Sequence, residues 1–135
     1  MVDSKDSLIT FIKNTLGCRC PEEVFENIDV KFIRPIENVG EFARVVVGNT
    51  LLVYVYCDGQ LGDVISSIEQ TTNKGRDDRN KNKYNRFRLV LPDSLGKNVI
   101  EEAKVNFVSE FQFDEKLNLH FVDSNQLDKL ELKST

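Results

Sequence analysis

The stretch Phe42-Ala43-Arg44-Val45-Val46-Val47-Gly48-Asn49-Thr50-Leu51-Leu52-Val53-Tyr54-Val55-Tyr56 holds two apolar runs on either side of a short polar turn. Gly48 and Asn49 are residue types that readily take the positive φ angles of tight hairpin turns. The second run is almost wholly apolar, which is typical of a central strand that is covered on both faces. The stretch therefore predicts a β-hairpin over residues 42–56.

Downstream of this hairpin, helical and extended apolar patterns alternate. A helix is expected after Gly59, and Ser124 is expected to cap a short final helix. Between them the sequence predicts a strand over 87–91, a helix over 96–111 and a strand over 117–122. Alternation of this kind favours right-handed crossovers between parallel strands. We therefore expect an α/β fold with a mixed, partly parallel sheet of about five strands. Its order would be a β-hairpin followed by a βαβαβ unit, with helices on both faces.

The segment before the hairpin predicts an N-terminal helical extension and one more strand. Apolar residues at helical spacing indicate a helix over residues 5–16, and Gly17 is a natural stop for it. A short second helix is expected to carry Val24, Phe25 and Ile28. A strand over 30–33 then ends before Pro35.

Composition places limits on the class of protein. The chain has 135 residues, of which 40% are hydrophobic and 30% charged, so we expect a single α/β domain over residues 1–135. The sequence contains no run of eighteen apolar residues, so we expect no membrane span. Its polar start lacks the pattern of a signal peptide. Three cysteines are too few for a disulfide scaffold. We expect a cytoplasmic protein with reduced thiols.

The turn Gly17-Cys18-Arg19-Cys20-Pro21 is the most distinctive chemical feature of the chain. Cys20 falls at an expected helix N-cap, where unpaired backbone N–H groups favour a thiolate. Cys18 lies one residue away, so the pair could close a disulfide or bind a soft metal. This pattern predicts that Cys18 and Cys20 form a reactive or ligand-binding element.

A metal site would need further ligands, and the chain offers Cys57 and His120. With Cys18 and Cys20 they complete a Cys₃His set for zinc, and three cysteines with another ligand would suit an iron–sulfur cluster. The spacing matches no standard metal motif. The structural alternative is that Cys20 caps a helix while Cys18 and Cys57 pack in the core.

Residues 73–88 form the second candidate site, since this segment carries +5 in a chain whose net charge is -4. We interpret it as a long basic loop between a helix and a strand. Such a loop would bind phosphate or nucleic acid, RNA in particular. The residues expected to contact phosphates are Lys74, Arg76, Arg79, Lys81, Lys83, Arg86 and Arg88. The alternative is a solvated loop whose arginines pair with acidic groups of the same chain.

Three aspartates, Asp58, Asp93 and Asp123, each follow a predicted strand. If these strands are adjacent and parallel, the three carboxylates lie at the edge where open α/β sheets bind ligands. They would suit Mg²⁺ there, although Asp after a strand is also ordinary turn chemistry.

Three functions remain open from the sequence. The first is a small cytosolic accessory protein that uses the Cys18–Cys20 turn for thiol redox chemistry or for a metal or iron–sulfur cluster. The second is a module that binds phosphate or nucleic acid through residues 74–88. The third is an interaction subunit without chemistry, whose helix over 5–16 docks on a protein partner or on a second copy of the chain.

Overall fold

The predicted hairpin lies at the centre of a five-stranded sheet in a computed structural model that describes residues 8–15, 27–37 and 39–130. The strands follow one another across the sheet in chain order. They are β1 (Ile28–Ile33), β2 (Glu41–Val47), β3 (Leu51–Asp58), β4 (Arg86–Pro92) and β5 (Leu117–Val122). β1, β2 and β3 pair antiparallel, whereas β3, β4 and β5 pair parallel. The expected mixed α/β sheet is confirmed.

The turn between β2 and β3 forms as the sequence predicts. Gly48 and Asn49 take φ angles of 57° and 56°, and the N–H of Thr50 donates to the carbonyl of Val47 over 3.1 Å. β3 is central, and its first five residues are buried. Burial on both faces explains why this strand lacks alternation of apolar and polar residues.

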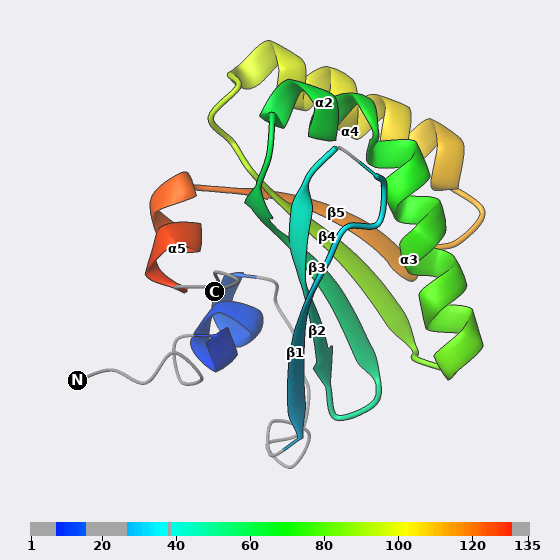
Figure 1. Cartoon of the computed structure of the whole chain (residues 1–135). Coiled ribbons are helices and arrows are strands. Elements are labelled where there is room, and N and C mark those ends of the chain that lie inside the picture. The colour runs from blue at the N-terminus through cyan, green and yellow to red at the C-terminus, as the bar shows by residue number, and fades with distance from the viewer. Residues whose placement is uncertain (1–7, 16–26, 38, 131–135) are drawn as a thin grey trace.

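Helices cover both faces of the sheet, also as predicted. Figure 1 shows α2 (Leu61–Ser66), α3 (Ile68–Asn82) and α4 (Lys97–Phe111) on one side. On the other side lie α5 (Ser124–Lys129) and the helical residues 8–15, which end in the π-helical turn η1 (Phe11–Thr15). Each layer has its own buried cluster of apolar side chains. No helix within the described ranges is long and apolar enough to cross a membrane.

The structure corrects the predicted basic loop. Residues 73–82 belong to α3 and residues 86–88 to β4, so only residues 83–85 form a turn. The buried side of this helix consists of Ile68 followed by Thr71, Thr72, Gly75 and Arg79. Because four of these five residues are small or polar, the apolar periodicity that identifies a helix is missing.

Two smaller predictions at element ends are also wrong. Ile28 starts β1 instead of belonging to a helix, while Val24 and Phe25 lie outside the described residues. The cap of α5 is Asp123, whose carboxylate accepts the N–H of Asn125 over 2.7 Å, and Ser124 is the first helical residue. Aspartate is as good an N-cap as serine, so the sequence alone could not choose between the two neighbours.

Gly75 lets α3 approach the sheet closely, because a Cβ atom at this position would overlap the ring of Phe87 on β4. Alanine normally favours a helix over glycine by up to about 1 kcal/mol. We expect Gly75→Ala to lower the free energy of unfolding instead, by about 1–3 kcal/mol, since overpacking outweighs the gain in helix propensity. Urea denaturation checks this.

Gly62→Ala in α2 is the matched control, because a Cβ atom there would meet nothing within 4 Å. This variant should leave the free energy of unfolding unchanged or raise it slightly. A Gly75→Ala protein as stable as the Gly62→Ala protein would contradict the close packing of α3 on Phe87.

Candidate functional site

The predicted thiol site cannot be assembled from the described residues, because Cys18 and Cys20 lie outside them. Cys57 is half-buried at the end of β3, and burial raises the pKa of its thiol to about 11. Its Sγ donates to the carbonyl of Val55 over 3.5 Å. It also lines a small hollow of about 190 Å³, together with Leu61 and Pro92. A thiol with a raised pKa is protonated at neutral pH and is a weak nucleophile.

No cluster of three His, Cys, Asp or Glu side chains suited to a metal ion occurs in the described part of the chain. His120 on β5 is engaged with Arg88 on β4 instead, with 2.7 Å between Nε2 of the histidine and Nη1 of the arginine. Since arginine only donates, Nε2 accepts and the imidazole proton is placed on Nδ1. His120 therefore does not join Cys57 in the predicted Cys₃His set.

The three aspartates do follow adjacent parallel strands, as expected. The carboxylates of two of them, however, make the contacts of turns and helix caps. The carboxylate of Asp58 accepts the N–H of Gly59 over 2.8 Å, and Asp123 caps α5. The backbone N–H of Asp93 donates to the carbonyl of Val122 over 2.9 Å. This arrangement matches the turn alternative and brings no magnesium site together in the described residues.

The seven basic residues of the segment 74–88 are dispersed over different surroundings. Arg79 is buried, and its Nη2 donates to Asp114 over 2.7 Å. The guanidinium of Arg76 lies over the ring of Phe113, with 5.8 Å to the centroid. Arg88 lies on the opposite face of the sheet beside His120. The remaining four, which are Lys74, Lys81, Lys83 and Arg86, are exposed.

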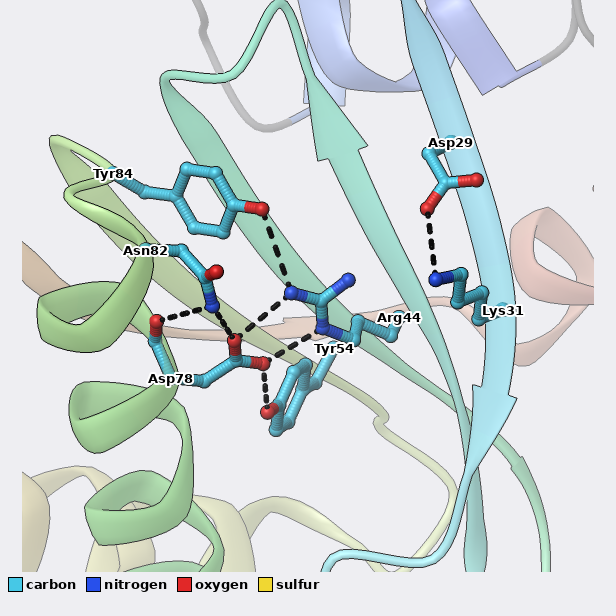
Figure 2. A network of polar contacts seen from close by, with 7 residues as sticks. All are labelled: Asp29, Lys31, Arg44, Tyr54, Asp78, Asn82 and Tyr84. Carbon is cyan, nitrogen blue, oxygen red and sulfur yellow. Dashed lines mark hydrogen bonds and ion pairs between the residues drawn. The ribbon is translucent and has the colours of Figure 1, made fainter.

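A polar network fastens α3 to the sheet, and Figure 2 shows Arg44 and Tyr54 directed from β2 and β3 toward Asp78 on the helix. Nε and Nη2 of Arg44 donate to the two oxygens of Asp78 over 2.7 and 2.9 Å. Tyr54 donates its hydroxyl to Asp78 over 2.6 Å, and Asn82 Nδ2 donates over 2.9 Å. Burial opposes ionisation of Asp78, but the hydrogen bonds from Arg44 and Tyr54 outweigh it and lower the pKa of the carboxyl. The network is structural, since its polar groups are largely used on one another.

A groove of about 540 Å³ lies between α2, α3 and α4. Its apolar lining comes from Ile65, Ile68, Val99, Ala103, Phe107 and Phe111. Three carboxylates, those of Glu69, Glu102 and Glu110, also line it, and no basic residue of the described chain does. None of the three makes an ion pair with a described residue. The groove therefore combines apolar surface with uncompensated negative charge.

Sequence reasoning missed this groove, although part of its signal was present. Val99, Glu102, Asn106 and Glu110 follow one another at steps of three or four residues, so they share one side of α4. That side neighbours the buried stripe of Ala103, Phe107 and Phe111. The opposing wall comes from Ile65 and Ser66 of α2 and from Ile68 and Glu69 in the first turn of α3, and its placement against α4 is a tertiary contact that the sequence pattern does not specify.

The chain gives no match to protein-family models, to curated proteins or to solved structures. Its candidate sites are therefore judged on their own geometry.

The Arg44–Asp78 network predicts an unequal effect of two adjacent substitutions. Asp78→Ala leaves Arg44, whose side chain is only 15% exposed, without its counter-ion. Loss of one partner of such a pair costs more than loss of a surface charge, and we expect about 2–4 kcal/mol in the free energy of unfolding. Asp77→Ala removes the same charge from an exposed neighbour and should change stability by less than about 0.5 kcal/mol. Equal urea midpoints for the two variants would contradict the structural role of the network.

Proposed function

We propose that this protein is a non-catalytic interaction module whose groove between α2, α3 and α4 binds a basic, apolar peptide segment of a protein partner. The single observation that carries this proposal is the lining of the groove, which joins apolar side chains to three unpaired carboxylates. A non-catalytic interaction subunit is also one of the three functions that the sequence left open. The surface now proposed is a different one from the helix over residues 5–16.

The apolar lining supports a peptide ligand. Ile65 and Val99 come from opposite walls, and Ala103 and Phe107 lie on the side of α4 that faces the sheet. Apolar side chains of a partner would lose contact with water on entering, at about 25 cal/mol per Å² of buried apolar area. Val99 is itself 37% exposed, so this surface is open to such a partner.

The carboxylates decide the charge of the partner. Glu102 and Glu110 are eight residues apart on α4, which corresponds to about 12 Å along the helix axis. Glu69 adds a third negative charge from α3. Lysine or arginine side chains on both flanks of an apolar segment would complement this pattern, whereas an acidic segment would be repelled.

The thiol function remains a prediction, because its two main residues lie outside the described ranges. Within those ranges, nothing favours it. Cys57 has a raised thiol pKa, and His120 is bonded to Arg88.

The groove proposal is tested with a synthetic peptide that carries one tryptophan, two leucines and flanking lysines. The chain has no tryptophan, so fluorescence excited at the indole band reports on the peptide alone. We expect the lysine peptide to bind and a peptide with glutamate in place of lysine to fail. The double variant Glu102→Gln/Glu110→Gln should weaken binding by about tenfold at low salt, which corresponds to about 1.4 kcal/mol.

The matched control is Glu101→Gln/Glu115→Gln, which removes two exposed carboxylates that do not line the groove. This variant has the same net charge as the groove variant, so general electrostatic attraction changes equally in both. Equal loss of binding in the two variants, or equal binding of the lysine and glutamate peptides, would refute the proposal.

A second candidate function, binding of a polyanion such as RNA, is favoured by one observation. Lys81, Lys83 and Arg86 are exposed around the turn from α3 to β4, and none has an acidic partner among the described residues. Lys116 is adjacent, with its Nζ donating to Asn85 over 3.0 Å. Exposed cations of this kind bind phosphates without regard to sequence.

For this second candidate, fluorescence anisotropy of a labelled oligouridine is the direct measurement. Lys81→Gln/Lys83→Gln should weaken binding and reduce the slope of log K against log salt by about 1.4, because each single-strand phosphate contact contributes about 0.7. Lys97→Gln/Lys104→Gln on α4 is the charge-matched control. A salt slope that is equal in both variants would exclude the turn as the site.

A further inference from the structure

Arg88 is a half-buried cation for which no described carboxylate serves as counter-ion. It lies on β4, on the sheet face that carries η1 and α5. Its one hydrogen-bond partner among the described residues is His120, whose Nε2 accepts from Nη1 of the arginine. Burial and the charge of Arg88 lower the pKa of His120 to about 4, so this partner is neutral and offers no compensating charge.

Two N–H donors beside this contact are buried and have no hydrogen-bond partner in the described part of the chain. They are Nε of Arg88 and Nδ2 of Asn118. The two residues occupy the same register position on the adjacent parallel strands β4 and β5, so their side chains leave the sheet side by side. An unpaired buried donor is costly, and an unpaired donor on a cation is more so.

One edge of the Arg88 guanidinium has no hydrogen-bond partner among the described residues. Nη1 is used by His120, whereas Nε has no partner and Nη2 makes no hydrogen bond with a described residue. Nε and Nη2 together form the fork with which arginine binds two oxygens of a carboxylate or phosphate. Arg79 differs in this respect, because its Nη2 donates to Asp114.

A second positive charge lies near Arg88. Arg86 is two residues before Arg88 on the same strand, so it projects from the same face of the sheet. The register neighbours of the two arginines on β3 are Leu51 and Val53, and neither carries a charge. The face therefore holds two adjacent guanidinium groups, an amide donor and no matching carboxylate within the described residues.

We propose that Arg88, Asn118 and Arg86 form a binding site for a small oxyanion, either a phosphate group or a carboxylate. Nε and Nη2 of Arg88 bind two oxygens, Nδ2 of Asn118 donates to one of them, and Arg86 adds attraction at the exposed side. His120 holds the guanidinium in place through Nη1. This site lies on the opposite face of the sheet from the peptide groove and is independent of it.

The single histidine of the chain supplies a direct probe of this site, because one imidazole signal is expected in a proton NMR spectrum. Inorganic phosphate and acetate are titrated separately, with chloride at the same ionic strength as the control. We expect the His120 resonance to move and saturate with phosphate, with acetate or with both, but not with chloride. Saturation with phosphate alone would identify a phosphate group, and saturation with acetate alone a carboxylate. Failure of both anions would overturn the proposal.

Asn118→Asp is the most informative variant, because it places a carboxylate of nearly the same shape beside Arg88. We expect it to raise the melting temperature in anion-free buffer and to weaken phosphate or acetate binding at least tenfold. Asn27→Asp, an exposed substitution with the same charge change, should do neither. A lower melting temperature for Asn118→Asp in anion-free buffer would show that the surroundings of Arg88 do not favour a negative charge, and anion binding unchanged in this variant would place the anion elsewhere; either result would overturn the proposal.

Arg88→Gln tests the fork itself and should abolish the anion-dependent movement of the His120 signal. Arg76→Gln, which removes a guanidinium from α3 on the other side of the sheet, is its control. Bound anion also raises the melting temperature of a protein that binds it only when folded. That rise should be present in the Arg76→Gln protein and absent from the Arg88→Gln protein, and the same rise in both would overturn the proposal.

Discussion

The ion pair between Arg44 and Asp78 is the interaction on which the helical layer depends, because α3 has little apolar surface with which to bind the sheet. Two hydrogen bonds join the two groups, and Tyr54 donates a third to the same carboxylate. Gly75 then permits the close approach of the helix to Phe87. A polar helix is thus held by directional contacts where most amphipathic helices rely on an apolar stripe. The position of α3 in turn sets one wall of the groove and the basic turn before β4.

The sheet was predictable from the sequence because its signals are local. The turn at Gly48 and Asn49, the apolar run of β3 and the periodicity of residues 96–111 each specify one element, and strand–helix alternation then specifies parallel pairing. The extent of α3 was not predictable in this way. Arg79 is buried there with Asp114, from a distant part of the chain, as its partner, and Thr71 and Thr72 are buried with hydroxyl groups that have no hydrogen-bond partner among the described residues. The groove was hidden for a related reason, since its two walls come from α2 with the first turn of α3 and from α4, which only tertiary packing brings together.

Net charge along the sequence was a poor guide to function because neighbouring residues on a helix point in different directions. The segment 73–88 carries +5, yet Asp78 and Arg79, adjacent in sequence, pair with Arg44 and Asp114 respectively. What remains for a polyanion is a smaller group of cations at the end of α3, where they also interact favourably with the helix dipole. The negative charge of the chain is likewise concentrated in part, with three carboxylates along the groove. As proposed binding surfaces, the two would therefore select ligands of opposite charge.

Three half-buried or buried arginines show how the same side chain can be structural or available for a ligand. Arg44 and Arg79 each meet a carboxylate at 2.7 Å, so the chain itself supplies the counter-ion that a desolvated guanidinium requires. Arg88 meets a neutral imidazole instead, and Asn118 beside it has an unpaired donor of its own. Since a desolvated cation and two unpaired donors are each unfavourable, together they favour a group with negative charge and at least two oxygens. An oxyanion would neutralise the cation and accept from both donors, whereas water would accept from the donors and leave the charge without a counter-ion.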